Sequence, residues 1–322
     1  MTADSSSSSE LIRHQDSQEI RSQSEAVLAK HARSFRLASL FLPAGKRVDA
    51  ALVYALCRLI DDTADECDDP RRAAVQLSAL REELDQKRFP RPLVGEFLEL
   101  SDRSDLDIEA VHELIRGVES DLEEVIFSTD EELLRYCYRV AGTVGLMMCA
   151  ILGVREPRAI CFAIDLGMGM QLTNICRDIL EDARRGRVYI PRERLETVGI
   201  SSEDLLAEEV DEEALATVVR DLLDLADQFY FSADKGMQYI PWRSRLAIVV
   251  ASRVYRAIGV KLRRQGAQVM RGRTIVSSLG RAYWVIRAFF IWILVSPPFA
   301  PRAPEHQQEL HKPLRGLPGV SS

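Results

Sequence analysis

The chain has 322 residues, of which 47% are hydrophobic and 28% are charged, a balance typical of a soluble globular protein. Its net charge of −7 argues against a general nucleic-acid-binding protein, which would usually carry a basic face. Six cysteines are scattered without CxxC or zinc-finger spacing, which argues against a disulfide framework or a cysteine zinc site and favours reduced thiols in an intracellular protein.

The first 25 residues open with the polar run MTADSSSSSE. They contain no basic segment followed by an apolar core, so no secretory signal is predicted and a cytoplasmic location is favoured. Their composition predicts a disordered extension over residues 1–25.

Beyond this extension, apolar residues recur at three- and four-residue steps, which is typical of helices. The segments expected to be helical are 48–67, 73–87, 107–126, 131–152, 157–184, 203–234 and 243–265. Proline and glycine separate these segments, and the alternation typical of strands is essentially absent. No linker rich in proline, glycine or serine divides the region, so we predict a single all-α domain over residues 26–280.

Residues 281–297 contain the apolar run YWVIRAFFIWILV, interrupted only by Arg287. A membrane span needs about 20 apolar residues, so this run is too short to span alone. Two interpretations are open. The segment could be a terminal helix that caps the bundle, or an interfacial helix in peripheral contact with the inner face of the membrane. Residues 298–322 are expected to be a disordered tail.

The first of two acidic clusters lies in the run CRLIDDTADE and contains Asp61, Asp62 and Asp65. On a helix, Asp61 and Asp65 stack on one face, where like charges repel by a few tenths of a kcal/mol. A bound cation would turn this repulsion into attraction. Arg58, one turn earlier, could bind a phosphate because a guanidinium matches phosphate oxygens bidentately. The alternative is a solvated acidic face with an arginine salt bridge.

The second cluster follows about 115 residues later in the run QLTNICRDILEDARRGRVYIP. Gln171, Asn174, Asp178 and Asp182 share one helix face, an amide and carboxylate set that can coordinate a metal over two turns. Mg²⁺ takes a few carboxylates together with water and substrate phosphate oxygens. The arginines after this cluster suit a polyphosphate, or alternatively cap the helix. Metal, arginines and an apolar helical bundle together favour ionisation of an allylic diphosphate in a dry pocket.

Several motifs resemble those of the squalene/phytoene synthase family, in the same order and spacing. They are LGMGMQLTNICRDILEDARRGRVYIP (166–191), YCYRVAGTVGLMM (136–148), HARSFRLASLFLP (31–43) and YALCRLIDDTADE (54–66). The resemblance covers roughly residues 30–275. It implies an isoprenoid-synthase-like helical bundle with a central apolar cavity.

The resemblance also implies roles for individual residues. The implied Mg²⁺ ligands, with Mn²⁺ as the alternative metal, are Asp61, Asp65, Asn174, Asp178 and Asp182. The residues implied to contact the prenyl diphosphates are Ser34, Phe35, Arg58, Gln171, Asn174, Arg177, Arg187 and Tyr255. The implied catalytic set is Tyr54, Arg58 and the four aspartates Asp61, Asp65, Asp178 and Asp182.

The family's reaction joins two prenyl diphosphates head to head through a cyclopropyl diphosphate. The segments AGTVG and RRGRVYIP resemble those of the family members that make phytoene from two C20 units, a step in carotenoid biosynthesis. Squalene and dehydrosqualene synthesis from two C15 units are the alternatives, and NADPH is expected only for squalene. A non-catalytic subunit that binds prenyl diphosphates is the alternative outside enzymes. The oligomeric state is left open.

Two further features, one in the motif 136–148 and one about ten residues before it, leave alternatives open. Ile126 and Phe127 stand where the family usually has Arg and Tyr, which predicts either an unchanged reaction or altered chemistry after ionisation. Gly142 and Gly145 could let a prenyl chain pass close to the helix, or could allow two helices to pack closely.

Overall fold

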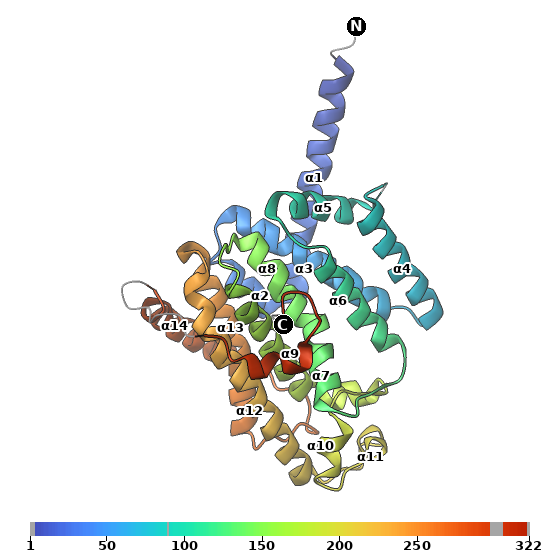
Figure 1. The fold of residues 1–322 in the computed structure, drawn as a ribbon, viewed down its shortest axis with the longest axis vertical. Coiled ribbons are helices and arrows are strands. Elements are labelled where there is room, and N and C mark those ends of the chain that lie inside the picture. Colours follow the sequence, from blue (N-terminus) through green and yellow to red (C-terminus); the bar gives the residue numbers. More distant parts are fainter. Residues whose placement is uncertain (1–3, 89, 297–304, 321–322) are drawn as a thin grey trace.

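Helices make up most of the structure, a computed structural model that describes residues 4–88, 90–296 and 305–320 (Figure 1). The α-helices are α1 (Asp4–His31), α2 (Arg33–Ser39), α3 (Ala44–Asp65), α4 (Pro70–Gln86), α5 (Pro92–Ser104), α6 (Glu109–Glu119), α7 (Asp130–Cys137), α8 (Thr143–Leu152), α9 (Ala159–Arg184), α10 (Arg192–Glu196), α11 (Ser202–Leu206), α12 (Glu212–Gly236), α13 (Trp242–Arg264) and α14 (Ser278–Leu294). The predicted all-α class is confirmed.

Shorter elements connect these helices. They are the 3₁₀ turns η1 (Ser120–Leu122), η3 (Met237–Tyr239) and η4 (Gln308–Leu314), and the π-helical turn η2 (Tyr138–Gly142) between α7 and α8. Two strands of two residues each, β1 (Val125–Ile126) and β2 (Arg187–Val188), pair in parallel. This pairing fastens the chain after η1 to the segment that leaves α9.

Local capping explains where several helices begin. The Asp69 side chain accepts a hydrogen bond from the Arg71 amide and precedes a proline at the first position of α4. The Asp211 side chain caps α12 by accepting hydrogen bonds from the Glu213 and Ala214 amides. The predicted helix 203–234 is therefore divided into α11 and α12. Helix α5 lies in an interval for which no helix was predicted.

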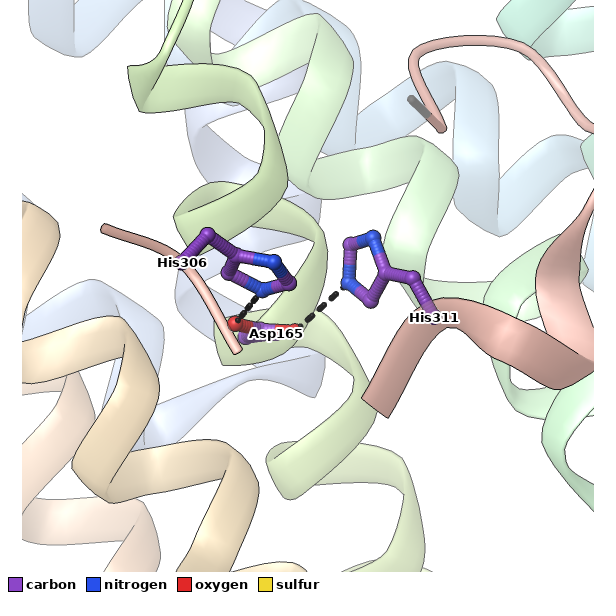
Figure 2. A group of neighbouring side chains, drawn as sticks. All are labelled: Asp165, His306 and His311. Atoms are coloured by element: carbon purple, nitrogen blue, oxygen red, sulfur yellow. Dashed lines mark hydrogen bonds and ion pairs between the residues drawn. The ribbon is translucent and has the colours of Figure 1, made fainter. Parts of the chain in front are cut away.

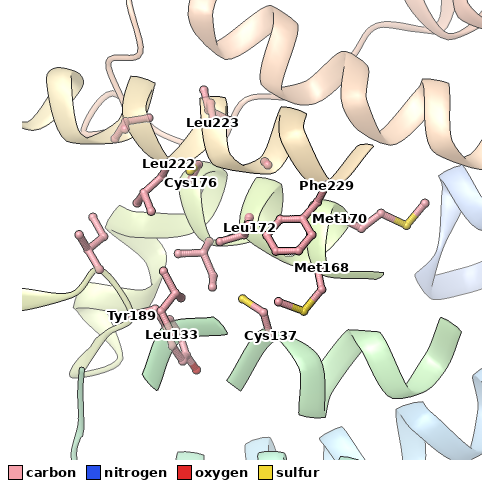
Figure 3. Close-up of a cluster of buried hydrophobic side chains, with 14 of the residues drawn as sticks. Leu133, Cys137, Met168, Met170, Leu172, Cys176, Tyr189, Leu222, Leu223 and Phe229 are labelled. Carbon is pink, nitrogen blue, oxygen red and sulfur yellow. The ribbon is translucent and has the colours of Figure 1, made fainter. Parts of the chain in front are cut away.

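Helix α9 lies at the centre and packs against α8, α12 and α13. Figure 3 shows its buried side chains Met168, Leu172 and Cys176 between those of α7 and α12. Among the described residues, α9 is the one helix apolar and long enough to cross a membrane, yet 72% of its apolar window is buried inside the protein. Its hydrophobicity is therefore that of a core helix, and the same helix carries the second acidic cluster.

The two ends of the chain differ from the expected disorder. Within the predicted extension 1–25, residues 4–25 belong to α1, and Ser24 in this helix is buried. Within the predicted tail 298–322, residues 305–320 pack on the bundle and bury Leu314 and Leu317. The sequence of the tail lacks the three- and four-residue apolar spacing of a helix. Its order therefore depends on contacts with residues far away in the sequence. Residues 1–3, 298–304 and 321–322 of these two predictions lie outside the described residues.

Helix α14 covers most of the segment 281–297, whose last residue lies outside the described chain. One face packs against α13, with Ala288 fully buried. The side chain of Arg245 fastens the end of this helix by donating hydrogen bonds to the Val295 carbonyl oxygen (3.1 Å) and to Ser296 Oγ (2.9 Å). The other face is apolar and exposed, with Leu279, Ile286 and Phe290 each more than half exposed.

Candidate active site

The two acidic clusters are brought to one cavity by α3 and α9. The cavity has a volume of about 330 Å³, and its polar lining includes Asp61 of α3 with Gln171 and Asn174 of α9. Asp65 follows Asp61 by one turn, and Asp178 and Asp182 follow Asn174 by one and two turns. These three carboxylates are not among the lining residues, so the clusters continue along α3 and α9 from the polar part of the lining.

Arginines connect the two clusters. Arg187, in β2 after α9, binds the Asp65 carboxylate through two nitrogens at 3.1 Å, and Arg185 reaches the same group at 3.3 Å. Arg58 pairs with Asp62 on α3. The arginine side chains that follow the second cluster therefore face the first one, which is the arrangement expected if both clusters belong to one site.

On α9, the Asp178 carboxylate is held by two guanidinium groups. Arg177 donates to it at 2.7 Å, and Arg273, from the segment after α13, lies 3.0 Å away. Arg273 also approaches Glu181. Arg273 was not among the predicted site residues, because the connection after α13 shows no motif that would place it near α9.

The surroundings of two carboxyl groups in the site disfavour their charged form. Burial raises the pKa of Asp61 to about 7, with a further contribution from the neighbouring Asp65 charge. Burial and the Asp178 charge raise the pKa of Asp182 to about 7. In addition, Asn174 Oδ1 is buried and accepts no hydrogen bond from the described part of the chain. Destabilised carboxylates beside an unsatisfied amide oxygen fit a hard divalent cation such as Mg²⁺, which prefers oxygen ligands.

These shifts predict how stability varies with pH when no metal is bound. Because the folded pKa of Asp61 lies above the ordinary value of about 3.9, the folded state binds more protons and this group's contribution weakens as pH rises toward 7. The melting temperature of metal-free wild-type protein should therefore fall between about pH 5 and pH 7 more steeply than that of Asp61→Asn, which cannot titrate there. Equal slopes in the two proteins, measured by thermal denaturation in chelator, would contradict this prediction.

Aromatic side chains line the cavity beside the polar groups. The ring of Phe35 on α2 lies 5.0 Å from Tyr255 on α13 and 6.4 Å from Tyr54 on α3, measured between centroids. Burial raises the pKa of Tyr54 to about 12, so its hydroxyl stays protonated. Ser34 is half-buried on α2 but is not among the described lining residues, whereas Ser39 of the same helix is.

The rest of the cavity is apolar and lies between α8, α9 and α13. On α8, Val144, Met148 and Leu152 form one lining face at helical spacing. Gly145 also borders the cavity, but a Cβ atom built on it would point at the α9 backbone, 2.2 Å from the Ala163 carbonyl oxygen. Of the two interpretations of this glycine, close helix packing is confirmed.

A buried tyrosine and carboxylate group next to the site was missed by the sequence analysis. Tyr136 and Tyr189 donate their hydroxyl hydrogens to the two oxygens of Asp121, at 2.8 and 3.0 Å. Burial raises the pKa of Asp121 to about 6. Arg187 approaches the Asp121 carbonyl oxygen, which connects this group to Asp65. The order of the residues along the chain gives no signal for this group, because pairing of β1 with β2 brings its parts together.

Phe127 belongs to the same neighbourhood. Its ring lies 5.4 Å from Tyr136 and 5.9 Å from Tyr189, and these two tyrosine rings stack at 4.9 Å. Ile126 lies in β1 and pairs with Val188. The position where the resemblance leads one to expect a tyrosine therefore has two tyrosine rings close to its phenylalanine ring.

Comparison with known proteins shows which family the sequence matches. The family model for squalene/phytoene synthase matches residues 28–284. The chain is 36% identical to a 15-cis-phytoene synthase of Pantoea ananas over 254 residues, covering 75% of this chain and 82% of that protein. It is 33% identical to a phytoene synthase of Rhodobacter capsulatus over 257 residues, covering 79% and 76%.

Solved structures with the same fold are also found. A dehydrosqualene synthase in complex with a ligand superposes with a TM-score of 0.79 at 27% identity, covering 86% of this chain and 98% of that one. A squalene synthase from Alicyclobacillus acidocaldarius superposes with a TM-score of 0.71 at 25% identity, covering 80% and 96%.

Proposed function

The chain belongs to the squalene/phytoene synthase family and is a prenyl-transferring enzyme, and on that premise we propose that it joins two geranylgeranyl diphosphates to make phytoene. The observation that carries the proposal is that both acidic clusters contribute polar residues, Asp61 from one and Gln171 and Asn174 from the other, to the lining of one apolar cavity. Relatives of similar length that are named phytoene synthases support the choice of product. Squalene or dehydrosqualene synthesis from two C15 units is the second candidate, favoured by the solved structures of similar fold.

Mg²⁺ would be held by Asp61 and Asp65 on one side and by Asn174, Asp178 and Asp182 on the other. When bound, it would neutralise the diphosphate and help it depart. The site's own charges allow the same substrate to be oriented, because Arg58, Arg177 and Arg187 already lie among the carboxylates. In the substrate complex these guanidinium groups would exchange carboxylate oxygens for phosphate oxygens of similar geometry.

The proposed reaction has two halves. In the first, one substrate loses its diphosphate, its C1 bonds to the double bond of the other, and loss of one proton closes a cyclopropane ring. In the second, the cyclopropyl diphosphate loses its diphosphate, rearranges to a 1-1′ linkage and loses one proton to give the central double bond. The apolar walls formed by Val144, Met148 and Leu152 would exclude water from the cationic stages.

The Ile126 and Phe127 substitutions are compatible with this reaction. Each carbocation must lose a proton, and the released diphosphate is a base available beside the two acidic clusters. Phe127 has no hydroxyl, but the rings of Tyr136 and Tyr189 lie within 6 Å of its ring. We therefore propose complete second-half chemistry rather than a reaction that stops at the cyclopropyl diphosphate.

The decisive experiment incubates the purified protein with C15 or C20 prenyl diphosphate and Mg²⁺, with and without NADPH, and identifies the products by mass. A C40 hydrocarbon formed without NADPH is the expected result. A C30 hydrocarbon made only with NADPH would instead identify a squalene synthase. Accumulated cyclopropyl diphosphate would contradict the proposal of complete second-half chemistry, and no pyrophosphate release would favour a non-catalytic binding protein.

We also propose that α14 holds the enzyme against a lipid surface, where a hydrocarbon product would dissolve. The exposed residues Leu279, Ile286 and Phe290 form one stripe at helical spacing, and the basic Arg281 and Arg287 lie on the same helix. An exposed apolar stripe with basic residues is typical of interfacial helices.

This membrane contact predicts that Ile286→Asp/Phe290→Asp will bind anionic phospholipid vesicles at least about tenfold more weakly than the wild type. The matched control is Val75→Asp on α4, which replaces another exposed apolar side chain away from α14. Vesicle co-sedimentation measures the effect. Equal sedimentation of the double variant and the control would show that α14 is not the contact.

A further inference from the structure

The C-terminal segment 305–320 crosses the outside of α9 and places two histidines on one buried aspartate. Asp165 lies on α9, six residues before Gln171, and its side chain is completely buried. His306 Nε2 lies 2.8 Å from Asp165 Oδ2, and His311 Nε2 lies 2.8 Å from Oδ1. Figure 2 shows the carboxylate between the two imidazole rings, which come from separate points of the segment.

The three groups converge as metal ligands do. The two imidazole nitrogens and a carboxylate oxygen all lie within 4.8 Å of one another, and both histidine side chains are nearly buried. Ligands of a tetrahedral Zn²⁺ ion, at about 2.0–2.2 Å from the metal, are separated by roughly 3–3.5 Å. The two observed nitrogen-to-oxygen distances of 2.8 Å are shorter than this separation, so an ion that binds here would move the imidazoles away from the carboxylate.

The donor set selects a particular class of cation. Two imidazoles and one carboxylate suit Zn²⁺ and its first-row neighbours, whereas Mg²⁺ prefers oxygen ligands alone. The thiol of Cys161, one turn before Asp165, donates to the Arg158 carbonyl oxygen and is not part of the converging set.

We propose that Asp165, His306 and His311 form a Zn²⁺ site that fastens the C-terminal segment to α9. This site is separate from the acidic clusters and uses different ligand chemistry. The fastened segment also receives hydrogen bonds from Arg135, to the Pro313 carbonyl oxygen at 2.9 Å, and from Tyr138, to the Pro318 carbonyl oxygen.

The proposed Zn²⁺ site lies close to elements that line the cavity. Tyr138 begins η2, whose Val140 and Ala141 line the cavity, and α9 lines it through Leu166 and Gly167. The segment 305–320 therefore lies behind the two elements that form one wall. A metal that holds the segment in place would restrain that wall without touching substrate.

The test uses Co²⁺ as a spectroscopic probe on the full-length protein with excess Mg²⁺ present. We expect one equivalent of Co²⁺ to give visible ligand-field absorption typical of a four- or five-coordinate site, displaced by Zn²⁺. His311→Gln and Asp165→Asn should each weaken binding at least about tenfold. The matched control is His112→Gln, because His112 forms a single pair with Asp85 at 2.8 Å and should leave the signal unchanged.

A second measurement does not depend on the variants folding. Hydrogen exchange of residues 305–320 in the wild type should slow when Zn²⁺ is added after chelation. Two results would overturn the proposal. One is a wild type without the absorption or without the Zn²⁺-dependent protection, as expected if the histidines only donate hydrogen bonds to Asp165. The other is a signal that survives in both ligand variants.

Discussion

Asp178→Asn should reduce pyrophosphate release by about 100- to 1000-fold, the size expected when one charged group that stabilises a transition state is lost. The substitution keeps the shape of the side chain and removes its charge. Arg177 and Arg273 both bind this carboxylate, so it is the point where the second cluster meets its cationic neighbours. As a proposed Mg²⁺ ligand, Asp178 would also lose affinity for the metal, so excess Mg²⁺ should restore part of the rate.

A matched control separates this effect from the loss of an arginine ion pair. Asp224 on α12 pairs with Arg263 at 2.8 Å, and its side chain is 66% exposed and does not line the cavity. Asp224→Asn should therefore retain near wild-type release and melting temperature. If Asp178→Asn released pyrophosphate as fast as Asp224→Asn, the proposed role of the second cluster would be wrong. Continuous pyrophosphate detection with C20 diphosphate measures both.

The acidic clusters could be predicted from sequence because their information is local. Asp61 and Asp65, like Asp178 and Asp182, are separated by one helical turn, so identifying the helix is enough to place each pair on one face. The resemblance to a family then indicated that the two faces meet. Their meeting is visible in the structure as the pairing of Arg187 with Asp65 across 122 positions of sequence.

The features that sequence missed depend on distant contacts. Asp121 meets Tyr189 only because β1 pairs with β2, two strands too short to give an alternating pattern. Order in the segment 305–320 depends on Asp165, a single charged residue in an apolar stretch of α9 more than 140 positions away. Composition suggested disorder for that segment because its stabilising partners are not near it in the chain.

The role of Gly145 could not be decided from its local motif alone. The motif AGTVG left open whether its glycines make room for a substrate or for a helix. In the structure, Gly145 of α8 approaches the α9 backbone at Ala163, and Gly167 of α9 approaches the backbone at Ala141 in return. A Cβ atom on either glycine would lie 2.2 Å from a carbonyl oxygen. Two reciprocal contacts of this kind fix how closely the helices cross.

Gly145→Ala should therefore destabilise the protein by about 1–3 kcal/mol, because backbone atoms rather than a flexible side chain must move. Since α9 also carries Asp178, a displacement of this helix should lower pyrophosphate release as well, by up to about 100-fold for a shift of 1 Å. Chemical denaturation measures the first effect and steady-state kinetics the second.

The matched control is Gly45→Ala in the first turn of α3, where an added Cβ would meet nothing within 4 Å. This substitution should be neutral or stabilise the protein by up to about 1 kcal/mol, because alanine restricts the unfolded chain. Equal stabilities of the two alanine variants would contradict the packing role of Gly145. A Gly145→Ala protein that is destabilised but keeps full activity would show that the α8–α9 crossing stabilises the fold without setting the distance between the two acidic clusters.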